Sequence, residues 1–380
     1  MLIIIILLEN SRPSRLLSAG AGKFFILDPE SGCGAHPGSP HSPHALTGRG
    51  NPDSFPGMRP EVFCLGAINL DLTFRVDDLD GLLQRWGTGL ARGGQEALSR
   101  AEEHRLRKLL ARFATPAGRT RGGQAANTAY ALARLGIPVA LAGRLGADAD
   151  GSFLRESLEG VDLEHVLQQG DSGRAYILVD PEGERTILVA PNANDQLEER
   201  DLPREALQEA RFLHLTSFGG DAPLRLQQLL AVSLQEGPRF TLDPGELYAR
   251  RGRTALEELL DRVETLLLTE AEWDLLGGEL TRHPVWAPPV VLIKRGPRGA
   301  RLLTPVRYLD IPAQFDGRPV DPLGAGDVFA AGYLAGLLIG LSLPQAARLA
   351  EAAAAYKSGG DRGESYPDRQ VLERIIARLS

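Results

Sequence analysis

The chain is poor in the residues on which several classes of protein depend. Cysteine occurs only as Cys33 and Cys64, and aromatic residues make up 6% of the sequence. Two cysteines are too few for a disulfide framework or a thiolate metal site, so a reducing cytoplasm is the expected setting. Positive charge is not in excess either, because the net charge is -7. This balance argues against nucleic-acid and membrane partners and favours a small molecule.

Long apolar runs are also lacking. The run at residues 2–8 is far shorter than the roughly 20 residues that span a bilayer, and no Lys or Arg precedes it as in a secretory signal. Residues 31–57 are dense in Gly, Pro, Ser and His, a composition that buries too little apolar surface to offset the entropy of ordering. We therefore interpret residues 1–57 as a disordered tail or non-native extension, and residues 58–380 as the folded domain that starts at Met58.

After Met58, short runs of Val, Ile and Leu alternate with helical patterns. This alternation predicts an α/β fold in which right-handed crossovers place helices on both faces of a mainly parallel sheet. Residues 172–192 predict a hairpin around an Asp-Pro-Glu-Gly turn, and residues 70–120 contain an amphipathic helix. Both segments are predicted lid elements. The predicted strands are residues 62–65, 139–142, 212–215, 240–242, 265–268 and 290–293.

A glycine-rich turn, Gly324-Ala325-Gly326-Asp327, leads into a predicted apolar helix at residues 328–341. Such a turn presents unpaired N–H groups and the positive end of the helix dipole, which together bind anions such as phosphate. A carboxylate at this entrance can accept the proton of an attacking hydroxyl, so Asp327 is a candidate general base. A simple helix cap is the competing interpretation, because Asp is common at N-caps.

Two earlier segments combine glycine with amide and carboxylate side chains. Gly122, Gly123 and Asn127 lead into a predicted helix at residues 128–135, and this pattern indicates close approach of a ligand to the backbone and hydrogen bonds to its hydroxyl groups. Asn69 and Asp71 are two residues apart in an extended segment, so their side chains share one face and suit vicinal hydroxyls. A turn with a helix start, or an Asx turn, would use the same residues.

A fourth segment, with Lys294, Gly296 and Gly299, follows the apolar run at residues 290–293. A Gly-x-x-Gly loop in this position can carry nucleotide phosphates, although an ordinary turn is the default interpretation of the loop alone. Taken together and in this order, the four segments resemble the PfkB or ribokinase family of carbohydrate and nucleoside kinases, over roughly residues 62–372.

The resemblance implies a ribokinase-like three-layer α/β sandwich with a mainly parallel central sheet and a small lid of β-hairpin and helices. It also implies ATP-dependent phosphorylation of a hydroxyl on a sugar or nucleoside. Asp327 would be the base and residues 324–326 the anion hole. The residues that would bind the substrate are Asn69, Asp71, Gly122, Gly123 and Asn127, and those beside ATP are Lys294, Gly296 and Gly299.

The cofactors that the resemblance implies are ATP and Mg²⁺, with a requirement for K⁺ left open. Glu272 would hold Mg²⁺ through water, and Asp321 matches a residue near a monovalent-cation site. Thr269 stands where the family usually has Asn, and Pro322 where it commonly has Thr or Ser. These two departures motivate an alternative: a catalytically weak sugar- or nucleotide-binding regulator on the same fold.

The substrate class stays open between two branches. The helical insertion within residues 80–120 resembles the adenosine-kinase-like branch. Gln124 stands where adenosine kinases usually have Ser, so a free sugar such as ribose, fructose or ketodeoxygluconate stays an alternative substrate. A homodimer formed through the lid is an alternative to a monomer. A dehydrogenase is disfavoured because no G-x-G-x-x-G surrounds Gly66, and a P-loop kinase because residues 20–23 lack the first glycine at the required spacing.

Overall fold

The structure is a computed structural model that describes residues 59–379, except for 88, 235, 315–322 and 360–364. The predicted tail at residues 1–57, the predicted start at Met58, and the loop residues Asp321 and Pro322 therefore lie outside the described residues. All described residues belong to one compact unit. Within it, no helix has both the length and the apolar character needed to cross a bilayer.

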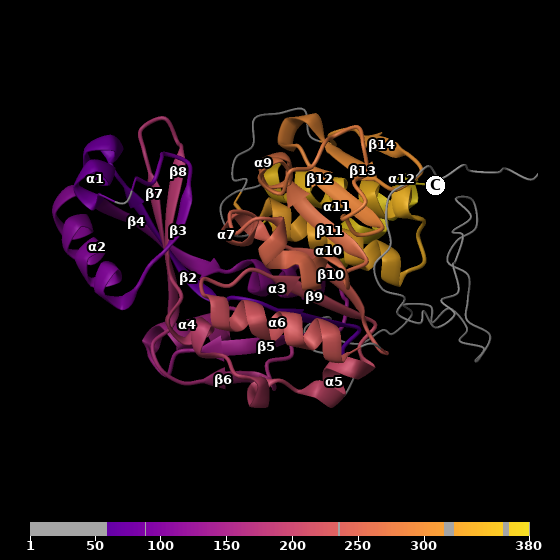
Figure 1. Ribbon diagram of the computed structural model, residues 1–380, viewed down its shortest axis with the longest axis horizontal. Coiled ribbons are helices and arrows are strands. Elements are labelled where there is room, and N and C mark those ends of the chain that lie inside the picture. The colour runs from indigo at the N-terminus through magenta and orange to yellow at the C-terminus, as the bar shows by residue number, and fades with distance from the viewer. Residues whose placement is uncertain (1–58, 88, 235, 315–322, 360–364, 380) are drawn as a thin grey trace, which may run out of the picture. The chain divides into compact units, whose positions relative to one another are not determined.

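The alternating apolar runs form a nine-stranded central sheet in the order β14-β13-β12-β11-β10-β9-β1-β5-β6 (Figure 1). Each predicted strand is present and pairs in parallel with its neighbours among them. Only β13 and β14, at one edge, pair antiparallel. The strands are β1 (Val62–Leu65), β5 (Val139–Leu145), β6 (Val166–Gln168), β9 (Phe212–Thr216), β10 (Arg239–Asp243), β11 (Thr265–Thr269), β12 (Val290–Lys294), β13 (Ala300–Leu303) and β14 (Tyr308–Ile311).

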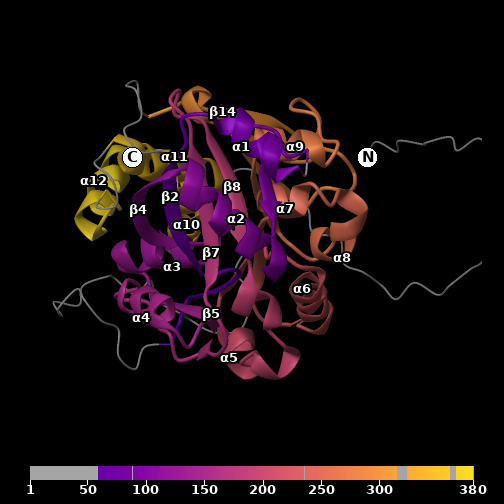
Figure 2. The same cartoon turned by 90° about the vertical axis from the view of Figure 1, so that its left-hand side faces the viewer.

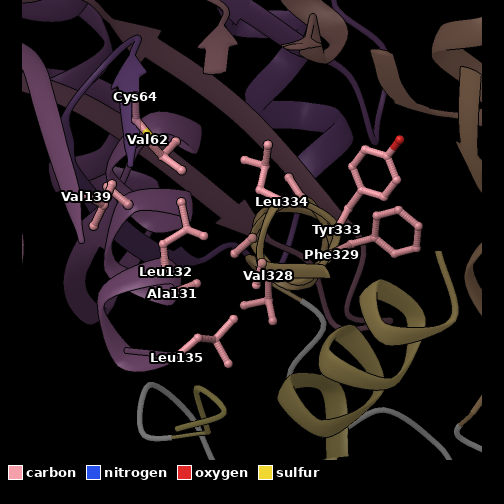
Figure 3. Close-up of a cluster of buried hydrophobic side chains, with 14 of the residues drawn as sticks. Val62, Cys64, Ala131, Leu132, Leu135, Val139, Val328, Phe329, Tyr333 and Leu334 are labelled. Carbon is pink, nitrogen blue, oxygen red and sulfur yellow. The ribbon is translucent and has the colours of Figure 1, made fainter. Parts of the chain in front are cut away.

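Alternate side chains of the central strands enter two separate apolar cores. In β1, Val62 and Cys64 pack on one face and Phe63 and Leu65 on the other, as the two-residue period of a strand requires. Figure 3 shows the first core, in which Leu334 of the helix at residues 325–338 and Val62 of β1 belong to the same buried cluster. Helices on this face are α3 (Gln124–Arg134), α4 (Ala149–Glu156), α10 (Ala325–Leu338), α11 (Leu343–Gly359) and α12 (Arg369–Leu379). Those on the other are α5 (Arg204–Glu209), α6 (Asp221–Ser233), α7 (Gly245–Ala249), α8 (Glu257–Leu260) and α9 (Glu270–Leu275).

A smaller five-stranded sheet, here called the lid sheet, has the order β3-β8-β7-β2-β4. The predicted hairpin is present as antiparallel β7 and β8. Helices α1 (Leu79–Trp86) and α2 (Arg100–Phe113) cover one face of this sheet, where Trp86 and Leu106 share a core with Tyr176 and Leu188 (Figure 2). The three-layer sandwich with a small lid is thus confirmed. The lid strands are β2 (Asn69–Arg75), β3 (Gln95–Ala97), β4 (Thr115–Gly122), β7 (Gly173–Val179) and β8 (Arg185–Ala190).

Candidate active site

Asp327 lies inside the first turn of α10, because the helix begins at Ala325. The apolar pattern of the sequence predicts a later start, at residue 328. Gly324 is the N-cap residue; its φ of +77° turns the chain into the helix. The capping interpretation of Asp327 is therefore wrong. The Asp327 carboxylate instead accepts a hydrogen bond from Asn127 Nδ2 at 2.9 Å. The N–H groups of residues 325–327 have no acceptor within the helix, so they are free to bind an anion beside this carboxylate.

Asn127 reaches Asp327 from the first turn of α3. This helix also begins earlier than predicted, at Gln124, after Gly123 with a φ of +91°. A Cβ at position 123 would lie 2.2 Å from the carbonyl oxygen of Ala67, so only glycine fits this turn. Asn127 Oδ1 is buried and has no hydrogen-bond partner among the described residues. It is an acceptor suited to a substrate hydroxyl.

Asn69 and Asp71 lie at the start of β2, where the chain passes from the central sheet into the lid sheet. Their side chains share a face, as predicted, and the residues are only 6% and 7% exposed. A Cβ on Gly122 would lie 1.8 Å from Asp71 Oδ1. Gly122 therefore leaves room for the carboxylate and does not itself line the cavity, whereas Gly123 does.

The predicted residues from both sheets line one cavity of about 230 Å³. Its walls include aliphatic side chains of the lid sheet and further polar residues that the sequence analysis did not single out. No Lys or Arg is among the described residues that line it. A larger, shallower hollow of about 760 Å³ around α5 shares no lining residue with it and contains none of the predicted site residues. The cavity lining includes Asn69, Asp71, Gln95, Gly123, Gln124, Asn127, Ile177, Ile187, Val189, Ser217, Phe218, Glu246, Leu247, Glu272, Gly324 and Asp327.

Two carboxylates of the cavity titrate near neutrality. The pKa of Asp327 is raised to about 7, chiefly by burial and also by the charge of Asp243, while the Asn127 hydrogen bond and Lys294 oppose the shift. The pKa of Asp71 is likewise raised to about 7, chiefly by burial and also by the charge of Asp327, while the charge of Arg121 lowers it. A general base with a pKa near the working pH combines availability with proton affinity, so Asp327 fits that role.

Lys294 supplies a buried cation beside the start of α10. Its Nζ lies 2.6 Å from Asp243 Oδ2 and would be 3.3 Å from a Cβ placed on Gly326. Burial lowers the pKa of Lys294, but the carboxylates of Asp243 and Glu272 outweigh burial and raise it. Lys294 therefore stays protonated where the phosphates of a nucleotide would meet residues 324–326.

Asp243 was missed by the sequence analysis, although it holds Lys294 and also accepts a hydrogen bond from Gln124 Nε2 at 3.2 Å. The available signal was its position directly after the apolar run at residues 240–242. Open α/β sheets bind ligands at the carboxyl ends of their strands, so a polar residue there is a candidate in its own right.

The remaining predicted residues are spread around this centre. Gly296 and Gly299 form the turn between β12 and β13, closed by Arg295 N–H to the Gly299 carbonyl at 2.8 Å, and neither lines the cavity. Glu272 lines it from the first turn of α9, where its carboxylate accepts from Thr269 N–H at 2.7 Å. Thr269 is therefore the helix N-cap. The described residues contain no cluster of three or more acidic, His or Cys side chains placed to hold a metal.

Comparison with known proteins bears on this arrangement. The family model for pfkB family carbohydrate kinases matches residues 114–359. The chain is 30% identical to a ribokinase of Bacillus subtilis, over 67% of this chain and 87% of that one. The chain belongs to the pfkB family of carbohydrate kinases. The family resemblance predicted from the sequence is confirmed.

Two further similar proteins extend the match to nearly the whole described chain. An ATP-dependent ribose-1-phosphate kinase of Halopiger xanaduensis is 29% identical over 83% of this chain and 98% of its own. The structure of an adenosine kinase from Sinorhizobium meliloti shares the fold, with a TM-score of 0.69 at 21% identity over 83% of this chain and 99% of that one. As a pfkB kinase, the protein phosphorylates a hydroxyl of a sugar or nucleoside at the expense of ATP.

Proposed function

We propose that the acceptor is a nucleoside and that Asp327 is the general base for its phosphorylation. The observation that carries the proposal is the composition of the cavity wall. Beyond the polar groups suited to a ribose, Ile177, Ile187 and Phe218 offer apolar surface, while Gln95 and Glu246 add hydrogen-bonding groups. An apolar wall facing a cluster of polar groups suits a planar base attached to a sugar better than it suits a free sugar, which is polar all round.

The steps follow from the positions of the side chains. Asn69, Asp71 and Asn127 bind ribose hydroxyls and hold the reacting oxygen near Asp327. As that oxygen forms a bond to the γ-phosphorus of ATP, its proton passes to the Asp327 carboxylate, and the bond from the γ-phosphorus to the ADP oxygen breaks. Charge on the transferred group is stabilised by Lys294 and by the N–H groups of residues 325–327.

Glu272 is the residue that we assign to Mg²⁺, which when bound with ATP neutralises phosphate charge. Mg²⁺ usually keeps several waters and is held by one or two carboxylates together with phosphates. Burial and the charge of Asp243 raise the pKa of Glu272, so a nearby cation would relieve an unfavourable concentration of negative charge. Dependence on K⁺ through Asp321 stays a prediction, because that residue lies outside the described residues.

A sugar phosphate is the second candidate acceptor, because one relative with nearly full coverage is a ribose-1-phosphate kinase. Burying a phosphate dianion without a cation is costly. The described residues that line the cavity include Asp71 and Glu246 but no Lys or Arg. This charge pattern favours the uncharged nucleoside.

The proposal is tested by ADP release from Mg-ATP with adenosine, inosine, ribose and ribose 1-phosphate as acceptors. We expect a nucleoside to give the highest kcat/KM. Asp327→Asn should lower kcat at least about 100-fold while leaving ATP binding intact, because only the proton acceptor is lost. Asp274→Asn, at an exposed position of α9, is the matched control. A preference for ribose 1-phosphate would transfer the proposal to the second candidate, and near-normal turnover by Asp327→Asn would remove Asp327 as the base.

A further inference from the structure

Asn194 makes a set of hydrogen bonds that the proposed reaction does not use. It is fully buried in the 3-10 helix η1 (Asn192–Gln196), which follows β8 of the lid sheet. Its Oδ1 accepts from Ile68 N–H at 3.0 Å, and its Nδ2 donates to the Ile68 carbonyl at 3.1 Å. The second Nδ2 hydrogen is directed to Asn69 Oδ1 at 2.8 Å.

These contacts fix the orientation of two amides by elimination. A backbone N–H can only donate and a carbonyl can only accept, so Ile68 determines which end of the Asn194 amide is oxygen. Asn194 then presents a nitrogen to Asn69, and a nitrogen donor requires an oxygen opposite it. Asn69 must therefore turn its own Nδ2 away from Asn194. That Nδ2 has no hydrogen-bond partner among the described residues, and Asn69 lines the cavity.

The two amides pack directly against the backbone of β7. Gly173, the partner of Asn69 in the pairing of β2 with β7, lies against both amides. A Cβ there would be 2.1 Å from Asn194 Nδ2 and 2.4 Å from Asn69 Oδ1. The neighbouring Asn192 has a φ of +47° and donates to Glu103 of α2 at 3.2 Å. The segment that carries Asn194 is thus anchored to the lid as well as to the cavity.

We propose that Asn194 is a positioning residue that makes Asn69 a hydrogen-bond donor toward the substrate and so sets the specificity of this end of the cavity. With Asp71 as the neighbouring acceptor, one hydroxyl oxygen accepts from Asn69 while its hydrogen is donated to Asp71. A group that can only donate, or a hydrogen in place of the hydroxyl, loses one or both bonds. The proposal rests on the proposed function in that Asn69 contacts the acceptor substrate.

The amide orientation can be measured without any substrate. In the full-length protein labelled with [¹⁵N]asparagine, side-chain signals are assigned by their loss in Asn69→Asp and Asn194→Asp variants. Both side-chain hydrogens of Asn194 should exchange with solvent at least about 100-fold more slowly than those of Asn69, because only the Asn194 nitrogen is bonded. Protected Asn69 hydrogens, or equal exchange at both residues, would overturn the inference whatever the enzyme phosphorylates.

Kinetics then test the functional part. In Asn194→Asp the carboxylate cannot donate, so the Asn69 amide is expected to reverse and donate to it. For adenosine we expect KM to rise about 30-fold, the cost of a mismatched buried hydrogen bond, with kcat and KM for ATP changed less than about 3-fold. Asn69→Ala should give a similar rise, and the double variant no further rise in KM for adenosine, because Asn194 reaches the substrate only through Asn69.

Substrate analogues separate positioning from a general structural role. Wild-type enzyme should discriminate against whichever of 2′-deoxyadenosine and 3′-deoxyadenosine lacks the bonded hydroxyl, and Asn194→Asp should lose most of that discrimination. Gln196→Ala, at an exposed position of the same short helix, should change neither constant. Equal losses in kcat and in both KM values, or additive losses in the double variant, would show that Asn194 acts only on folding. If wild-type enzyme fails on adenosine but the exchange pattern holds, the substrate assignment fails and the positioning role stands.

Discussion

The central sheet and the lid sheet contribute different chemistry to the same cavity. Central strands end in charged side chains, with Asp243 at the end of β10 and Lys294 at the end of β12. The lid strands contribute Ile177 and Ile187 to the wall. Under the proposed function, the central sheet organises phosphate transfer, and recognition of the acceptor is divided between the lid wall and the junction at Asn69.

Strand geometry explains why the lid wall is apolar. Ile177 faces the cavity, and its neighbours Tyr176 and Leu178 pack under α1 and α2. In β8 the same alternation places Ile187 at the cavity and Leu188 in the helix-covered core. In β7 and β8, both faces are therefore apolar for different reasons. The helices of the same chain cover one face, so that face needs no second copy to bury it. The alternative of a homodimer through the lid stays untested.

The largest effect should come from the buried cation of the central sheet. Lys294→Met removes the charge beside residues 324–326, and we expect kcat with Mg-ATP and adenosine to fall about 100-fold, the usual scale for losing electrostatic stabilisation of a transition state. KM for ATP should rise as well. Steady-state ADP release measures both constants.

A control separates this loss from destabilisation. Lys294→Met alone leaves Asp243 buried without its cation, which by itself destabilises a fold. Adding Asp243→Asn removes the unpaired charge, so thermal stability should recover while kcat stays low. Recovery of activity together with stability would mean that Lys294 only balances Asp243, and the assignment of phosphate chemistry to this end of the sheet would be lost.

A smaller effect is expected on the pH dependence of kcat/KM. Asp327 must be ionised to accept a proton, and burial raises its pKa to about 7, so activity should rise with pH and level off above about 7. Asp71 titrates in the same range, so the rising part of the pH profile, here called the limb, reports the joint titration of Asp71 and Asp327. Asp243→Asn removes a charge that raises the Asp327 pKa, and the limb should move roughly one unit to lower pH. Asp274→Asn should leave it in place, and an upward shift in Asp243→Asn would contradict this account of the Asp327 environment.

The central sheet is also the region that the sequence predicts best. Its strands are continuous apolar runs because helices bury both faces, and such runs are visible without tertiary information. Asp327 and Asn127 are found for a related reason: each follows a glycine that turns the chain into a helix. The helix starts are misjudged because Gly324 and Gly123 are the N-caps themselves, so the helices begin before their apolar patterns do.

The lid side of the site is less visible in the sequence. Asn194 belongs to a polar cluster after the hairpin that looks like a loop, and its role depends on meeting Ile68, more than a hundred residues earlier in the chain. Gln95 lies in a strand with little apolar pattern, yet its N–H donates to Glu246 of α7 at 3.3 Å and it lines the cavity. Contacts of this kind depend on how the two sheets meet, which no local pattern encodes.

The smallest expected effect is that of Ile187→Ala, which tests whether the lid wall recognises the acceptor or only closes the cavity. Ile187→Ala removes apolar surface from the cavity wall, and we expect kcat/KM for adenosine to fall about 10-fold with little change for ribose, which does not reach that wall. Leu188→Ala is the matched control, because Leu188 packs under α1 and α2 instead of lining the cavity. This substitution should lower thermal stability without changing the preference between acceptors. Equal losses for adenosine and ribose in Ile187→Ala would mean that this wall only closes the cavity, and selection of the acceptor would then rest with Asn69, Asp71 and the positioning of Asn69 by Asn194.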